Sequence, residues 1–136
     1  MDLALDPSLP AIQTDAERLR LALVNLITNA RQSFDPQRGG AVSQGSTPRV
    51  LVSTEAGPSH AIVTIADNGA GISHDDVPHV FDPYFTTKRG GTGLGLPIAK
   101  HVVEGLGGII TVSTVPGRGT DVRIELPLRP VEVASR

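Results

Sequence analysis

The chain has 136 residues, of which 39% are hydrophobic, so it carries enough apolar side chains for one domain with one core. Its formal net charge of −2, with no polybasic block, argues against a surface for nucleic acid or membrane, and no apolar run reaches the roughly 18 residues of a membrane span. Cysteine is absent, which excludes disulfides, cysteine-ligated metals and thiol nucleophiles and is compatible with the cytoplasmic location that we expect.

The N-terminal quarter predicts an edge strand and a long helix. Residues 2–13 alternate loosely in polarity and contain two prolines, which is typical of an edge strand followed by a turn. Thr14 and Glu17 have the spacing of a capping box, so we expect a helix to begin at Thr14 or the next residue. Apolar residues at 3.6-residue spacing continue it to about Phe34. Residues 35–48 have loop composition, and we expect them to be mobile.

A hairpin and a short helical turn are expected next. Apolar runs at 49–55 and 60–67 predict two strands joined by a tight turn. Ser73 and Asp76 are spaced to cap one short helical turn before Pro78.

A second helix and a second hairpin complete the domain. The helix is predicted to begin at 94–97, because an apolar stripe recurs every four residues up to Leu106, and Gly107 and Gly108 stop it. Strands are predicted over 109–115 and 120–126, the second with clean alternation. Hairpins outnumber strand–helix–strand units. The sequence therefore predicts an α+β, two-layer sandwich with a mixed, mostly antiparallel sheet and helices on one face.

Two amides stand out on the first predicted helix. Asn25 and Asn29 are four residues apart, so they project from the same side, and Asn29 falls at the edge of the apolar stripe. A half-buried amide needs polar partners, because leaving it unpaired costs about 1–3 kcal/mol. The pattern fits a ligand-binding pair, two ordinary surface amides, or an amide that bonds a neighbouring loop.

A carboxylate ends the second predicted strand. Asp67 shares a strand face with Ala61 and Ile65, so it stands at the rim of the core if that face is buried. It could accept a hydrogen bond from an exocyclic amine, with Gly69 and Gly71 letting a flat ring approach the backbone. Aspartate before Asn-Gly is also a common turn former, which is the alternative.

A glycine-rich segment leads into the second helix. Gly90–Gly95 would place free backbone N–H groups and the positive end of a helix dipole where phosphate binds well, and Lys88 lies just before it. A flexible linker is the alternative. The P-loop pattern and the dinucleotide pattern G-x-G-x-x-G are both absent. The four histidines show no metal-ligand spacing.

Five motifs occur in one order along the chain. They are NLxxNA, DNGAGI, FDPYFTTK, GTGLGL and GRGT, beginning at Asn25, Asp67, Phe81, Gly91 and Gly117. Together they resemble the catalytic, ATP-binding domain of sensor histidine kinases, within the gyrase/chaperone/kinase ATP-binding superfamily, which has the Bergerat fold. The FDPYFTTK segment is most similar to the nitrogen-regulation type. The resemblance implies a catalytic domain over 1–128 and a tail over 129–136.

The resemblance implies roles for individual residues. Asn29 corresponds to the catalytic asparagine that ligates Mg²⁺, and Asp67 to the acid that reads the adenine amine. Residues 73–92 correspond to a lid over the nucleotide, in which Lys88 would serve catalysis by neutralising the phosphates. The further nucleotide contacts implied are Asn25, Gly69, Gly71, Thr87, Lys88, Gly91, Thr92, Gly93, Leu94, Gly95 and Thr120.

The implied activity is transfer of the γ-phosphate of ATP, with Mg²⁺, to a histidine on a separate dimerisation domain of the same two-component kinase. A response regulator would act downstream, and the isolated chain would be a monomer. Hydrolytic ATPases of the superfamily carry a glutamate four residues before the metal asparagine, where this chain has Asn25. The alternatives are a stand-alone member, such as an anti-sigma serine kinase or a hydrolytic ATPase, and a non-catalytic nucleotide-sensing module.

Overall fold

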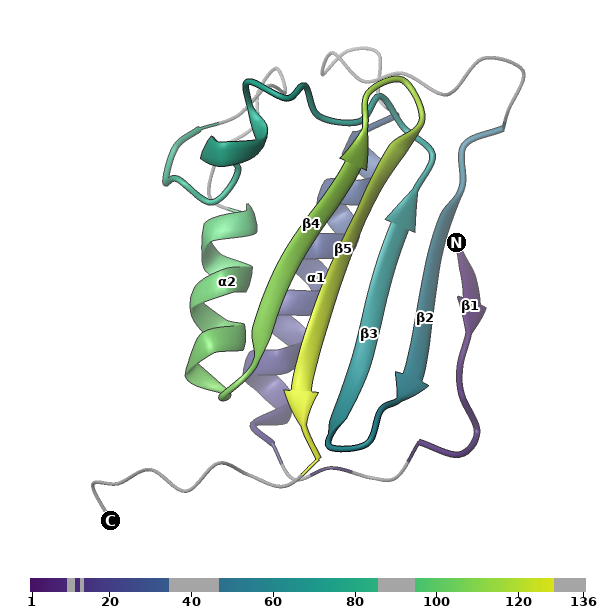
Figure 1. Cartoon of the computed structure of the whole chain (residues 1–136), viewed down its shortest axis with the longest axis vertical. Coiled ribbons are helices and arrows are strands. Elements are labelled where there is room, and N and C mark those ends of the chain that lie inside the picture. The colour runs from purple at the N-terminus through teal and green to yellow at the C-terminus, as the bar shows by residue number, and fades with distance from the viewer. Residues whose placement is uncertain (10–11, 13, 35–46, 86–94, 129–136) are drawn as a thin grey trace.

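The computed structural model describes residues 1–9, 12, 14–34, 47–85 and 95–128. These residues form a five-stranded sheet with two α-helices packed against it (Figure 1). The predicted α+β sandwich is confirmed. The predicted tail and most of the loop over 35–48 lie outside the described residues.

The sheet has the order β1-β2-β3-β5-β4. Its strands are β1 (Asp2–Ala4), β2 (Val50–Ala56), β3 (His60–Asp67), β4 (Ile109–Val115) and β5 (Gly119–Pro127). β1 pairs with β2 in parallel, and every other pairing in the described sheet is antiparallel. The mixed, mostly antiparallel sheet and the edge position of the first strand agree with the sequence prediction.

The first helix, α1 (Ala16–Gln32), begins where the sequence predicted, but its cap is a different residue. Asp15 is the N-cap, and its Oδ1 accepts a hydrogen bond from the backbone N–H of Arg18 at 3.1 Å. The predicted capping by Thr14 is therefore wrong. Aspartate is at least as good an N-cap as threonine, and from this position its charge lies next to the positive end of the helix dipole.

The short turn expected before Pro78 extends past that proline. The carbonyl oxygen of Ser73 accepts from the N–H groups of Asp76 and Val77 at 3.0 and 3.1 Å, which closes the turn. The 3₁₀-helix η2 (Val77–His79) then includes Pro78, and Asp76 makes no side-chain cap. A proline fits this early helical position because its φ is already helical and its missing N–H would have no partner there.

The core lies between the sheet and the two helices, α1 and α2 (Gly95–Gly105). Ala22 of α1 and Ala99 of α2 are fully buried, and side chains this small let the two helices approach each other closely. The other buried apolar residues of this core are Leu26, Ala30, Val50, Val52, Ile65, Val102, Val103, Ile110, Val122, Ile124 and Leu126. In the described part of the chain, no helix has the length and apolar character needed to cross a membrane.

Candidate functional site

A row of polar side chains crosses the sheet at one end of its helix-facing side. The pairing registers align Val50 with Asp67, Asp67 with Thr120, and Thr120 with Thr114. Cross-strand partners point to the same face, so one carboxylate and two hydroxyls lie together at the rim of the apolar core. The expectation that Asp67 extends the buried face of β3 is confirmed, since Ile65 on that face is 1% exposed.

Several elements meet at this end of the sheet. Figure 1 shows that α1 and β3 end there, that α2 and β2 begin there, and that β4 turns into β5 there. The termini of helices and the ends of strands carry backbone groups with no ladder or helical partner, so such a meeting point can hold a polar ligand.

The first glycine motif, which comprises Gly69 and Gly71 of the DNGAGI segment, is packed tightly against other parts of the protein. Asp67 accepts a hydrogen bond from the N–H of Gly69 through Oδ1 at 2.9 Å, so it does form a turn. A Cβ atom on Gly69 would collide with the hydroxyl of Ser33 at the end of α1. Gly71 has a φ of 74°, and a Cβ there would lie 2.5 Å from the carbonyl oxygen of Val115. Packing alone therefore explains why both positions are glycine, and their contact with a nucleotide base stays a prediction.

The turn between β4 and β5 lies along the first glycine motif. The N–H of Gly117 donates to the carbonyl oxygen of Ala70 at 2.7 Å. Gly119 has a φ of 136°, and a Cβ there would overlap the carbonyl oxygen of Asp67. These two glycines thus hold the last hairpin against the end of β3.

Thr114 also joins the β4–β5 turn to the first glycine motif, through its hydroxyl. Its Oγ1 accepts from the N–H of Ile72 at 2.8 Å and donates to the carbonyl oxygen of Gly119 at 3.0 Å. It also lies 3.0 Å from Oγ1 of Thr120. The position of Thr120, a predicted nucleotide contact, is therefore linked to the backbone after the first glycine motif.

Asn25 faces the start of the second helix. Its Nδ2 donates to the carbonyl oxygen of Leu21 at 2.8 Å, one turn earlier in α1. Its Oδ1 lies 3.9 Å from the position that a Cβ on Gly95 would take, and Gly95 is the first residue of α2. The structure thus brings the first predicted amide next to the helix end predicted to bind phosphate.

Asn29 lies between two parts of the site. It follows Asn25 and precedes Ser33 by one turn each, so the three side chains run along one side of α1. Asn25 meets Gly95 at one end of this line, and Ser33 meets Gly69 at the other. The half-buried Asn29 is therefore flanked by the start of α2 and by the Asp67 turn.

The predicted phosphate contacts before Gly95 cannot be placed. Thr87, Lys88, Gly91, Thr92, Gly93 and Leu94 lie outside the described residues. Their roles stay predictions. What the structure does show is that an 11-residue helix begins immediately after them.

The described half of the expected lid, 73–85, is attached to the core. Val80 is 7% exposed, and the half-buried Phe81 packs against the core cluster. Nζ of Lys100, on α2, lies 5.0 Å from the centre of the Phe81 ring, which is within the range of a cation–π contact.

Sequence reasoning missed three residues that shape this site, namely Ser33, Asn68 and Thr114. Ser33 carries a usable signal, because it lies four residues after Asn29 on the same side of the helix. Asn68 carries one as well, since asparagine before glycine commonly bonds nearby backbone groups. Thr114 carries none, because its role depends on pairing across the sheet.

Metal binding by side chains of this chain would depend on few donors. The described residues contain no group of three or more His, Cys, Asp or Glu side chains placed to hold a metal ion. A divalent ion held here by an amide oxygen would take its remaining ligands from a ligand's phosphates and from water.

The comparisons with known proteins concern the family and the fold of the chain. The family of histidine kinase-, DNA gyrase B- and HSP90-like ATPases matches residues 14–130. The chain is 38% identical over 121 residues to the sensor histidine kinase ZraS of Salmonella typhimurium, covering 89% of this chain and 24% of ZraS. It is 33% identical over 129 residues to the sensory histidine kinase/phosphatase NtrB of Rhizobium meliloti, covering 90% of this chain and 33% of NtrB. A crystal structure of full-length ShkA in complex with AMPPNP superposes with a TM-score of 0.76 at 26% identity, covering 97% of this chain and 26% of ShkA.

The chain belongs to the histidine kinase-, DNA gyrase B- and HSP90-like ATPase family. Within it, the chain is homologous to sensor histidine kinases, and its fold is that of their ATP-binding catalytic domain. The predicted resemblance is confirmed, and the comparisons do not support the alternative classes. The chain spans 24% of the length of ZraS and 33% of the length of NtrB.

Proposed function

We propose that this domain binds ATP with Mg²⁺ and presents the γ-phosphate to a histidine on the dimerisation domain of the same two-component kinase. The observation that carries the proposal is the pairing of Asp67 with Thr120 at the end of the sheet where α1 ends and α2 begins. That arrangement offers an acceptor for a base and a helix N-terminus for phosphates within one site.

Asp67 is the residue that would recognise adenine. Its carboxylate accepts hydrogen bonds, and adenine presents an exocyclic amine that donates them. Guanine presents a carbonyl oxygen at the same position, which a carboxylate repels. Thr120 lies directly opposite on β5 and could add a hydroxyl contact. The domain should therefore prefer ATP to GTP.

The phosphates would lie toward the start of α2. Asn25 and Gly95 line that end in the structure, and the resemblance adds Thr87, Lys88 and 91–94. Asn29 would supply one amide oxygen to Mg²⁺, which when bound neutralises phosphate charge. The domain would then contribute positioning and charge stabilisation rather than a covalent step.

Asn25 favours transfer over hydrolysis. A hydrolytic ATPase needs a base to activate water, and an amide is not a base at neutral pH. In addition, the amide nitrogen of Asn25 already donates to Leu21 within α1. The acceptor histidine, the downstream response regulator, a cytoplasmic location and a monomeric state of the isolated chain belong to the same proposal.

Calorimetry on the 136-residue chain tests the proposal. We expect one Mg²⁺-dependent ATP site, and Asp67→Asn should weaken ATP binding by roughly tenfold or more, since losing an acceptor for a buried amine costs about 1–3 kcal/mol. The substituted amide can still accept from Gly69, so the turn is kept. GTP binding as tight as ATP binding, or full affinity in the variant, would refute the assignment.

A further inference from the structure

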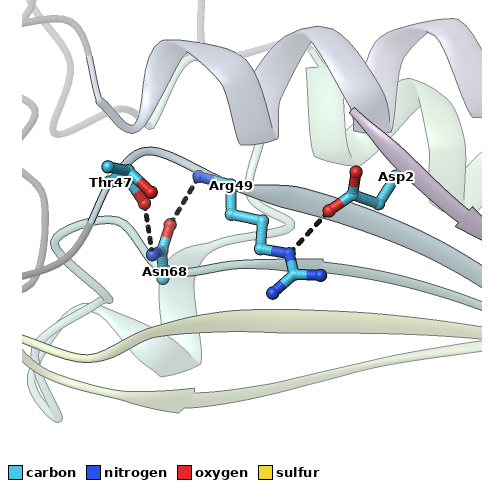
Figure 2. A network of polar contacts seen from close by, with 4 residues as sticks. All are labelled: Asp2, Thr47, Arg49 and Asn68. Carbon is cyan, nitrogen blue, oxygen red and sulfur yellow. Dashed lines mark hydrogen bonds and ion pairs between the residues drawn. The ribbon is translucent and has the colours of Figure 1, made fainter.

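Asn68 ties the end of β3 to the start of β2 (Figure 2). Its Oδ1 accepts from the N–H of Arg49 at 2.8 Å, and its Nδ2 donates to the carbonyl oxygen of Thr47 at 2.8 Å. The backbone N–H of Asn68 also donates to the carbonyl oxygen of Arg49 at 3.3 Å. One residue thus makes three hydrogen bonds to a segment that is distant in sequence.

These bonds continue the β2–β3 pairing beyond its last ladder position. On the β2 side the ladder ends where Val50 pairs with Asp67, while on the β5 side Asp67 pairs with Thr120. A strand edge without further bonds on one side frays more easily on that side. Asn68 follows Asp67 directly, so its amide holds the backbone on the far side of the carboxylate. Gly69, whose N–H bonds Oδ1 of Asp67, comes next and is held in turn.

We propose that Asn68 is a positioning residue for nucleotide selection: by clamping Thr47 and Arg49 it keeps the Asp67 carboxylate oriented toward the purine amine. This inference rests on the proposed function, in which Asp67 reads adenine. We assign Asn68 no direct contact with the nucleotide. It acts through Asp67, because a carboxylate on a frayed strand end would spend less time in the accepting orientation.

A role limited to folding predicts a different result. If Asn68 only stabilised the domain, its loss would weaken the binding of all purine nucleotides alike. If it orients Asp67, the loss should fall on nucleotides that carry the exocyclic amine. Purine riboside triphosphate, which has hydrogen in place of that amine, separates the two cases, with ATP as its partner in the comparison.

The test is calorimetric titration of ATP and of purine riboside triphosphate, each with Mg²⁺, into the 136-residue chain and its variants. Asn68→Ala removes the side-chain bonds to Thr47 and Arg49 and should lower ATP affinity about fivefold, as for the net loss of one hydrogen bond. Affinity for purine riboside triphosphate should change by less than about twofold. Thermal melting shows that each variant is folded at the temperature of the titration.

Asn68→Asp provides a second variant if the alanine variant does not fold. Its carboxylate can still accept from Arg49, but it cannot donate to Thr47 and instead repels that carbonyl oxygen. It should show the same selective loss for ATP. Asp2→Asn is the matched control, because Asp2 bonds the Arg49 side chain at 2.6 Å at an exposed position and leaves the Asn68 bonds intact. It should bind both nucleotides as the parent chain does.

The outcomes separate the inference from the proposed function. The positioning role is overturned if the Asn68 variants lose equal affinity for both nucleotides, or lose affinity for neither. The adenine contact of Asp67 would still stand in that case if Asp67→Asn lost affinity for ATP alone. If Asp67→Asn itself loses no ATP preference, the adenine contact fails and the inference fails with it. The inference is supported if Asn68→Ala loses affinity for ATP alone and the variant carrying both Asn68→Ala and Asp67→Asn binds ATP no more weakly than Asp67→Asn does.

Discussion

The hydroxyl of Ser33 occupies the space that a side chain on Gly69 would need. Ser33 is the C-cap of α1, and its Oγ also donates to the carbonyl oxygen of Ala30 at 2.6 Å. The end of the helix that carries Asn29 is thereby seated against the turn that carries Asp67. Asn29, the proposed metal ligand, and Asp67, the proposed adenine contact, lie on different elements, and this direct contact would keep their separation constant.

Gly69→Ala should therefore destabilise the domain. The added Cβ would collide with the hydroxyl of Ser33 and lie 2.7 Å from its Cβ, so one element must shift. We expect a loss of about 1–3 kcal/mol in the free energy of unfolding, measured by urea denaturation. Ser33→Gly in the same chain removes both colliding atoms and should restore part of the loss. An alanine variant as stable as the parent would show that the contact is loose.

Asn29→Ala and Asn25→Ala should differ in their response to metal. The two amides lie one turn apart on α1, but we propose Mg²⁺ binding for Asn29 alone, and the Asn25 amide nitrogen bonds Leu21. We predict that Asn29→Ala abolishes the dependence of ATP affinity on Mg²⁺, and that Asn25→Ala largely keeps it. Titration of Mg²⁺ against nucleotide affinity measures this, and equal metal dependence in parent and both variants would contradict it.

Thr114→Val should loosen the link between the last hairpin and the first glycine motif. Valine has the shape of threonine but cannot accept from Ile72 or donate to Gly119. We expect a loss of about 1–3 kcal/mol in unfolding free energy, because a half-buried N–H loses its acceptor. Thr111→Val, at an exposed position on the same strand, is the control and should change stability by less than about 0.5 kcal/mol. Equal effects at both positions would mean that the hydroxyl bonds contribute nothing.

The expected lid should respond to nucleotide mainly in its second half. Val80 and Phe81 attach the first half to the core, so backbone amides near them should be protected from hydrogen exchange in every state. Residues 86–95 should gain protection with an ATP analogue and less with ADP, because Lys88 and the glycine backbone gain phosphate partners. Hydrogen exchange in the apo, ADP and analogue states tests this. Equal protection of 86–95 in all three states would show that this segment does not respond to the nucleotide.

The sequence alone determined the elements and the family. Apolar runs bounded by turn residues placed β3 and β4 at the residues where the structure has them, and side-chain direction along each strand follows a period of two residues. The same period put Asp67 on the buried face of β3. Five motifs in one order indicated the ATP-binding family, since each motif is a short local segment of the sequence.

The tertiary structure decided how these segments meet. Local sequence could not choose between Thr14 and Asp15 as the cap of α1, because both residues can accept the same kind of bond. The parallel pairing of β1 with β2, the contact of Ser33 with Gly69, and the clamp from Asn68 to Arg49 join residues far apart in the chain. Such contacts form only when the helices and the sheet have packed, so no local pattern of polarity or propensity encodes them.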